Sequence, residues 1–240
     1  MAHQPDIDGV LIEWGDRLFY PGNRRVHSKE TWSPSQRHRR AATIRASIAA
    51  TVVRRAPQVM VKVTGGGRGM KPIVAHLNYI SKRGRLPMTD ERGEIAVGKE
   101  AVREMADDWR YGGALIEEVS HRREAFNIML SMPAGTNASI VERSAREFAE
   151  QEFREHKYVM VLHDHQANPH VHLSVRAESV RGRRLNPRKA DLQRWRETFA
   201  EKLRGWGVDA EATRQAIRGV QRRYPEIWQV KAAQEARLRN

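Results

Sequence analysis

The chain contains no cysteine, which excludes disulfide bonds and any zinc site built on thiolates. No apolar run approaches the roughly 20 residues that a membrane span requires, and the N-terminus has no signal-peptide core. Acidic residues are in deficit, with 29 Asp and Glu against 43 Lys and Arg. We therefore expect a protein of the reducing cytoplasm that does not insert into a membrane.

The excess of basic residues gives a formal net charge of +14 on 240 residues. Such a charge favours an anionic polymer as the partner, because neutralising phosphates supplies affinity that does not depend on sequence. A ribosome-like role or binding to a membrane surface fits the charge equally well. The length allows one good hydrophobic core with extensions. Composition therefore predicts a polyanion-binding protein without identifying the polyanion.

A cluster of histidines between residues 161 and 175 is the most informative part of the sequence. His170 and His172 alternate with apolar residues, so in a strand both rings point to the same face. Residues 158–162 also have strand character, and the intervening segment is rich in turn formers. The resulting hairpin brings His163 opposite the pair, within about 5 Å. Three imidazoles that converge in this way predict a site for a divalent metal ion.

Other interpretations of the histidines remain open at this point. A strand histidine is often an ordinary polar residue with its hydrogen bonds satisfied, and four histidines within ten residues can also arise by chance. A structural zinc site normally has four ligands that include thiolates, which this chain cannot supply. A site with three histidines leaves positions for water or a phosphate, as a catalytic metal requires. We favour the divalent metal site.

The hydrophobic patterns predict a basic N-terminal extension at 1–56, a compact domain at 57–207 and a charged, mostly helical tail at 208–240. The extension is expected to be an arm with a short helix near 41–53, which either follows a nucleic-acid backbone or is simply solvated. A hairpin within a series of helical connections indicates the α+β class, with a largely antiparallel sheet and flanking helices. The expected order begins with a strand at 58–63, a helix that follows the glycine run, passes through Ile73 and stops near Gly84, and a helix at 99–110. A strand at 125–132, a helix from the N-cap Asn137 to about 154, the histidine hairpin and a helix at 188–203 follow.

A glycine-rich run that includes Arg68 occupies residues 65–69, between the first strand and the first helix of the domain. It has neither the P-loop spacing nor the dinucleotide-binding spacing, so nucleotide binding is a weak hypothesis. A turn that allows close approach of the backbone is favoured. A DNA phosphate bound at the helix N-terminus is one possible ligand of this turn.

Tyr79 has the basic neighbours Lys82, Arg83 and Arg85. On a helix, Lys82 and Arg83 would share the face of Tyr79. A phenol is a weak nucleophile at its usual pKa near 10, and nearby cations or a base would help to form the phenolate. From its neighbours alone, an ordinary half-buried tyrosine is the favoured interpretation.

Three segments of the sequence together resemble the motifs of relaxases, the nicking enzymes of plasmid mobilisation and conjugation. Within that family, the resemblance is to the branch that contains the T-DNA border endonuclease of Agrobacterium. The segment from His163 to His172 is similar to the third motif, and residues 61–84 are similar to the first motif with its nucleophilic tyrosine. Residues 131–136 are similar to the second. The motifs occur in the family's order within residues 58–205, which makes the resemblance specific.

The resemblance implies an HUH-type endonuclease fold and single-stranded DNA at an origin of transfer as the substrate. Tyr79 would be the nucleophile, and His163, His170 and His172 would bind the metal. Magnesium or manganese is implied by the family, whereas three imidazoles would also suit zinc. The residues expected to contact DNA are Ser131, Arg68, Lys82, Arg83 and Arg85.

The sequence departs from the family at His165, where many relatives have an acidic residue; Asp164 precedes it by one position. In a strand, His165 would face the same way as His163 and could orient a ligand, accept the proton of Tyr79 or act as a ligand. The general base, His165 or Asp164, therefore stays open. No helicase or primase signature is present, so we expect relaxosome accessory proteins and a type IV secretion coupling protein to supply unwinding and export. The alternatives are another metal nuclease, such as a replication initiator, and a non-catalytic DNA-binding module.

Overall fold

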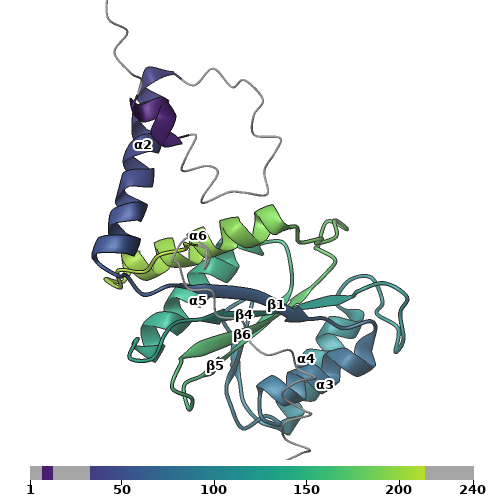
Figure 1. The fold of residues 1–240 in the computed structure, drawn as a ribbon. Coiled ribbons are helices and arrows are strands. Elements are labelled where there is room, and N and C mark those ends of the chain that lie inside the picture. The colour runs from purple at the N-terminus through teal and green to yellow at the C-terminus, as the bar shows by residue number, and fades with distance from the viewer. Residues whose placement is uncertain (1–6, 13–32, 214–240) are drawn as a thin grey trace, which may run out of the picture.

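The computed structural model describes residues 7–12 and 33–213 (Figure 1). Its centre is a six-stranded sheet in the order β1-β4-β6-β5-β2-β3, and every neighbouring pair is antiparallel. Helices flank this sheet, so the predicted α+β class is confirmed. The strands are β1 (Met60–Gly65), β2 (Met88–Asp90), β3 (Ile95–Ala96), β4 (Ala125–Ser131), β5 (Tyr158–His163) and β6 (His170–Arg176).

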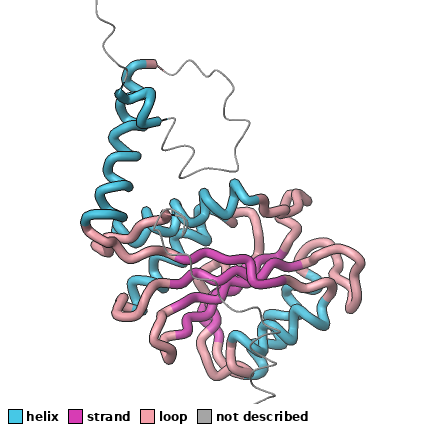
Figure 2. The backbone as a smooth tube through the Cα atoms, viewed as in Figure 1, coloured by secondary structure: helices cyan, strands magenta, loops and turns pink. Residues whose placement is uncertain are grey.

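Helices cover both faces of the sheet, as Figures 1 and 2 show. Helices α5 (Ala138–Glu152) and α6 (Lys189–Gly205) pack on one face, where Phe148, Trp195 and Phe199 are fully buried. Helices α3 (Met70–Ile80) and α4 (Lys99–Tyr111) pack on the other. Strand β5 contributes side chains to both hydrophobic cores, because its alternate side chains point to opposite faces of the sheet.

The expected elements of the compact domain are present in the expected order. Helix α5 begins after Asn137, whose side chain accepts a hydrogen bond from the backbone N–H of Ser139, as the N-cap pattern predicts. The histidine hairpin is confirmed as the pair β5–β6. The short strands β2 and β3 were not expected, because two or three residues are too few to show an alternating pattern.

The N-terminal extension contains a longer helix than the sequence suggested. Helix α2 (Pro34–Ile48) continues into the π-helical turn η1 (Ala49–Val53) and rises away from the sheet in Figure 1. Its early start is explained by a capping box, in which Ser33 and Gln36 each bond the other's backbone N–H. Residues 1–6 and 13–32 of the expected arm lie outside the described residues.

The first residues of the expected helical tail are extended instead. Residues 208–213 contain no helix, and the carbonyl oxygen of Glu211 accepts a hydrogen bond from the backbone N–H of Val59. Ala210 and Ala212 are buried in the same core as α5 and α6, so this segment packs on the domain. The remainder of the expected tail, 214–240, lies outside the described residues. No helix within 7–12 and 33–213 is both long and apolar enough to cross a membrane.

Candidate active site

The hairpin brings three histidines together at one end of the sheet. His163 ends β5 and pairs directly with His170 at the start of β6, while His172 follows two residues later on the same face. Their ring centres are 4.6–5.1 Å apart, and one ring nitrogen from each lies within 4.8 Å of the others. All three side chains are buried. This group could therefore hold a metal ion.

Two of these histidines have their outer nitrogen fixed by the backbone. His163 Nε2 donates to the carbonyl oxygen of Ile80 at 2.7 Å, and His170 Nδ1 donates to that of Asn168 at 2.9 Å. A carbonyl oxygen only accepts, so the facing ring nitrogen must carry the proton. The lone pair of each ring is then on the remaining nitrogen, Nδ1 of His163 and Nε2 of His170. Such outer hydrogen bonds orient metal-binding histidines.

Burial favours the neutral form of two of the three histidines. It lowers the pKa of His172 to about 3, with further contributions from the neighbouring histidines, and it is also the main cause of the lowered pKa of His163. Neutral imidazoles have a lone pair available for a metal ion. His172 Nδ1 is buried without a hydrogen-bond partner among the described residues, in contrast to the backbone-bonded nitrogens of His163 and His170. The donor set and its protonation therefore fit a divalent ion.

Tyr79 lies in the last turn of α3, next to the histidine cluster. Its ring centre is 6.1 Å from that of His172, and its side chain is 67% exposed. The expected half-buried tyrosine is thus an exposed one. An exposed phenol beside a cluster of potential metal ligands is accessible to a substrate in solution.

The expectation that Lys82 and Arg83 share a helix face with Tyr79 is wrong, because α3 ends at Ile80. The backbone N–H of Arg83 donates to the carbonyl of Asn78, and that of Lys82 donates to the carbonyl of Tyr79. These bonds form a Schellman motif, which terminates the helix. Lys82 and Arg83 accordingly have positive φ angles of 49° and 59°. The basic residues lie in the turn after the helix instead.

His165 and Asp164 lie beyond the end of β5 and are exposed. The strand alternation used to orient them therefore does not extend to these positions. Even so, the ring of His165 lies 5.2 Å from that of His163. The structure thus places His165 at the rim of the cluster, next to one of its members.

The glycine-rich run forms a close backbone contact and is not an open phosphate cradle. A side chain at Gly66 would lie 2.2 Å from the carbonyl oxygen of Ala125. The first N–H groups of α3, on Met70 and Lys71, already donate to carbonyls of residues 117 and 118. These two N–H groups are therefore not available to bind a phosphate at this helix N-terminus. Arg68 is exposed beside them, just before the start of α3, whereas Tyr79 lies in the last turn of that helix.

Ser131 is next to the cluster but is 5% exposed. It pairs with His170 across β4 and β6, and its hydroxyl donates to the carbonyl of Pro169 at 3.4 Å. The neighbouring backbone N–H of Met132 donates to the same carbonyl. In this arrangement Ser131 supports the residue that precedes His170.

The sequence interpretation missed His76. Its ring lies 6.2 Å from that of Tyr79 and 6.4 Å from that of His172, and burial lowers its pKa to about 4. The signal was present in the sequence, because residues three apart on a helix share a face. His76 is therefore a further imidazole of the site, beside both Tyr79 and the histidine cluster.

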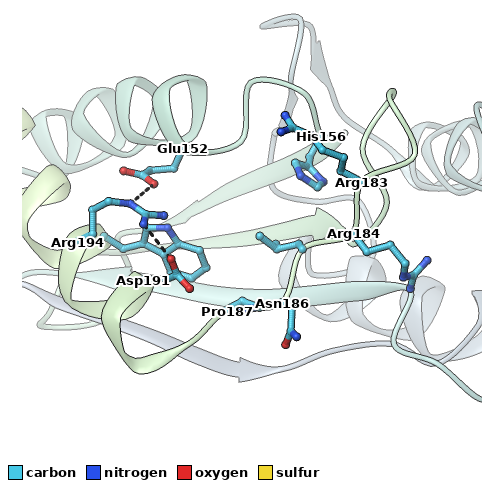
Figure 3. A pocket seen from close by; sticks show the side chains of 10 residues that line it. Glu152, His156, Arg183, Arg184, Asn186, Pro187, Asp191 and Arg194 are labelled. Atoms are coloured by element: carbon cyan, nitrogen blue, oxygen red, sulfur yellow. Dashed lines mark hydrogen bonds and ion pairs between the residues drawn. The ribbon is translucent and has the colours of Figure 1, made fainter. Parts of the chain in front are cut away.

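A separate cavity of about 300 Å³ lies between the end of α5, the loop after β6 and the start of α6 (Figure 3). It adjoins His156, just before β5 begins, whereas the histidine cluster is at the other end of that strand. Its arginines are neutralised, since Arg194 pairs with Glu152 and Asp191, and Arg183 pairs with Glu155. This cavity contains none of the residues predicted for the site.

Comparison with known proteins identifies the class to which this fold and site belong. The model of the MobA/VirD2-like relaxase nuclease domain matches residues 79–208, more than half of the chain. The matched segment begins at Tyr79 and includes all three clustered histidines. The chain therefore belongs to the relaxase family.

The curated relatives are T-DNA border endonucleases named VirD2. The chain is 25% identical over 186 residues to that of Rhizobium radiobacter, which covers 69% of this chain and 44% of the relative. The chain is also 25% identical to the protein of Agrobacterium fabrum, in an alignment that covers 69% of this chain and 42% of the relative. Its identity to the protein of Rhizobium rhizogenes is 24%, with 68% of this chain and 42% of the relative covered. The chain thus spans less than half the length of these relatives.

Proposed function

We propose that this protein nicks and rejoins single-stranded DNA at a plasmid origin of transfer. The observation that carries the proposal is the exposed ring of Tyr79, 6.1 Å from the ring of His172 in a cluster of three potential metal ligands. Membership of the relaxase family and similarity to border endonucleases support it. The excess of basic residues is consistent with a polyanionic substrate.

The proposed reaction is a transesterification with Tyr79 as the nucleophile. The phenolic oxygen attacks the scissile phosphorus as its proton passes to an acceptor, and an oxygen–phosphorus bond forms. The bond from phosphorus to the 3′-oxygen breaks, and that oxygen takes up a proton. The products are a 5′-phosphotyrosyl link and a free 3′-hydroxyl. One phosphodiester replaces another, so the reverse reaction rejoins the strand.

His163, His170 and His172 would hold the divalent ion, for which we propose magnesium or manganese, with zinc as the alternative. When bound, such an ion supplies Lewis-acid polarisation of the scissile phosphate. The chain orients the rings of His163 and His170 through the carbonyls of Ile80 and Asn168, and burial favours the neutral form of His163 and His172. The chain also presents the phenol of Tyr79 on the adjoining helix end.

The remaining predicted residues surround this centre. His165, whose ring lies 5.2 Å from that of His163, is one candidate for accepting the phenolic proton, and Asp164 is the alternative. Lys82, Arg83 and Arg85 follow Tyr79 in the turn and would contact DNA phosphates next to the scissile bond. Arg68 would contact DNA only at a distance from the site, and Ser131 would act by supporting the segment before His170.

We also propose that the nicking domain comprises about residues 57–207 together with the packed segment that follows, and that it acts in the bacterial cytoplasm. Relaxosome accessory proteins and a type IV secretion coupling protein would supply unwinding and export. The basic helix α2 is a candidate for additional contacts to the DNA backbone.

Labelled single-stranded oligonucleotides covering the transfer origin of the protein's own plasmid test the proposal. We expect site-specific cleavage in the presence of Mg²⁺ or Mn²⁺, with the 5′ end of one product attached to protein. Cleavage only at a replication origin would favour a replication initiator. Binding without any cleavage would favour a non-catalytic DNA-binding module. Either result contradicts the relaxase proposal.

A further inference from the structure

Two buried ring nitrogens beside Tyr79 have no hydrogen-bond partner among the residues that the structure describes: His172 Nδ1 and His76 Nε2. An unsatisfied buried polar atom costs about 1–3 kcal/mol, so such a pair calls for an explanation. The other two clustered histidines have their outer nitrogens bonded to backbone carbonyls. His172 is therefore the one member of the cluster whose second ring nitrogen has no hydrogen bond to the described residues.

The spacing of the two rings suits one bridging water. The ring centres of His76 and His172 are 6.4 Å apart, and the ring planes are inclined at 75°. A direct hydrogen bond of about 2.9 Å would bring the two ring centres to within about 5 Å. Two consecutive hydrogen bonds through a water span the longer separation. Buried waters typically occupy such positions between polar groups that lack protein partners.

We propose that His76 is a positioning residue that binds the outer nitrogen of His172 through one water. The inference rests on the metal centre proposed above. Donation from His172 Nδ1 leaves the lone pair on Nε2, facing the ligand nitrogens of His163 and His170. His76 Nε2 completes the arrangement from the other side of the water. All three clustered histidines then have an outer partner.

Neighbouring groups on α3 are less suited to this role. The side-chain amide of Asn78 already donates to the carbonyl of Val74 at 3.0 Å. Tyr79 is 67% exposed and is assigned to attack the substrate. His76 is the member of this helix face with a buried, unpartnered nitrogen.

The assignment gives α3 a second link to the histidine cluster. Ile80 at the end of the helix holds His163 on β5, and His76 one turn earlier would hold His172 on β6. Tyr79 lies between these two anchors in the sequence. The position of the nucleophile relative to the metal is then set by the same contacts that orient the ligands.

Calorimetric titration of the full chain with Mn²⁺ tests the inference without any measurement of activity. His76→Leu keeps much of the volume but removes the polar atoms, and we expect Mn²⁺ to bind about 10–100-fold more weakly. His76→Gln can still bond a water, and its affinity should remain within about threefold of wild type. His121→Gln, in an exposed loop, is the matched control and should bind normally. Thermal melts establish that each variant is folded.

Equal affinities for His76→Leu and wild type would overturn the proposal, and so would an equal loss in His76→Leu and His76→Gln, which would indicate packing alone. If the wild type itself binds no Mn²⁺, the metal centre fails and the inference with it. A second test uses the wild-type protein alone. Nitrogen chemical shifts of His172 in the metal-free protein should show the Nδ1–H tautomer, and an Nε2–H tautomer would contradict the proposal.

Discussion

The Nε2 atom of His163 donates a hydrogen bond of 2.7 Å to the carbonyl oxygen of Ile80, 83 residues earlier in the chain. Ile80 is the residue after Tyr79, so this bond joins the end of α3 to the histidine hairpin. It fixes the ring of His163 and also limits the movement of the helix end that carries the tyrosine. Any change that displaces this helix end should therefore affect both the proposed metal ligands and the proposed nucleophile.

The first prediction concerns the nucleophile. Tyr79→Phe removes only the phenolic oxygen from an exposed ring, so stability should change by less than about 0.5 kcal/mol. DNA affinity should be retained, but no covalent adduct should form. Gel analysis of the protein–DNA product checks this. Tyr111→Phe is a matched control, because Tyr111 is also 67% exposed and lies at the end of α4.

Peptide mapping of the trapped adduct identifies the attacking residue independently. The other tyrosines are weaker candidates. Tyr158 is buried, and this burial raises its pKa to about 12, which disfavours the phenolate. A nucleotide attached to Tyr20, Tyr111, Tyr158 or Tyr224 would refute the assignment of Tyr79.

The second prediction concerns the metal ligands. His170→Ala and His172→Ala should each abolish cleavage, since each removes one of three potential ligands. Binding of single-stranded DNA should be largely retained, because it depends on the basic surface. Cleavage assays and gel-shift titrations at one fixed salt concentration separate the two effects. Normal nicking by both variants in the presence of a chelator would exclude the metal mechanism.

His165 is the subject of the third prediction. It is exposed, and its ring lies 5.2 Å from that of His163. His165→Asp introduces the residue type common in the family and should retain activity, whereas His165→Ala should lower the rate and leave metal binding intact. Parallel measurement of cleavage rate and Mn²⁺ affinity distinguishes the roles. A loss of metal as large as that in His172→Ala would make His165 a primary ligand.

The sequence was sufficient to place the histidine hairpin, because the alternation of His170 and His172 with apolar residues has the period of a strand. It also predicted the start of α5 from the N-cap residue Asn137. The end of α3 could not be predicted in the same way. Lys82 and Arg83 have no unusual helix preference, yet both adopt positive φ in the Schellman motif, where their N–H groups donate to Tyr79 and Asn78.

The contacts that orient the side chains of the site could not be predicted from the sequence either. The partners of His163 and His170 are backbone carbonyls, which every residue has, so no side-chain pattern signals them. The glycine run was predictable from its composition. The sequence favoured a turn that allows close approach of the backbone, and Gly66 packs against the backbone of Ala125 in this way.

The fourth prediction follows from the lowered pKa of His172. In the folded, metal-free protein its pKa is about 3, against 6.5 in the unfolded chain. Below pH 6.5 the unfolded state takes up a proton that the folded state does not, so stability is present above this pH and is lost as the pH falls toward 3. Between pH 7 and pH 5 this residue should account for a loss of about 2 kcal/mol.

Urea unfolding with a chelator present, at pH 7 and at pH 5, measures this loss. In His172→Gln the titrating ring is gone, so the decrease in unfolding free energy between the two pH values should be smaller by about 2 kcal/mol than in wild type. An identical decrease in the two proteins would show that His172 is not the neutral, buried group described.

The last prediction tests whether the turn after α3 positions Tyr79. Gly84 has a φ of +79°, and a side chain there would lie 2.3 Å from the backbone of Gly98. Gly93 has a similar φ of +81°, but a side chain there would meet no atom of the described residues within 4 Å. Alanine at Gly93 should therefore cost only the conformational penalty of about 1–2 kcal/mol. Alanine at Gly84 should add about 1–3 kcal/mol for the steric conflict.

The two glycine variants should also differ in catalysis. Relieving the conflict at Gly84 requires the turn to move, and the turn is continuous with Ile80, whose carbonyl holds His163. We expect Gly84→Ala to reduce both the nicking rate at saturating DNA and the affinity for Mn²⁺, while Gly93→Ala leaves both near wild type. Equal nicking rates in two folded variants would mean that this turn does not position the nucleophile. If the nicking rate of Gly84→Ala fell while its Mn²⁺ affinity stayed unchanged, the turn would position Tyr79 alone. The orientation of the histidines would then not depend on the end of α3.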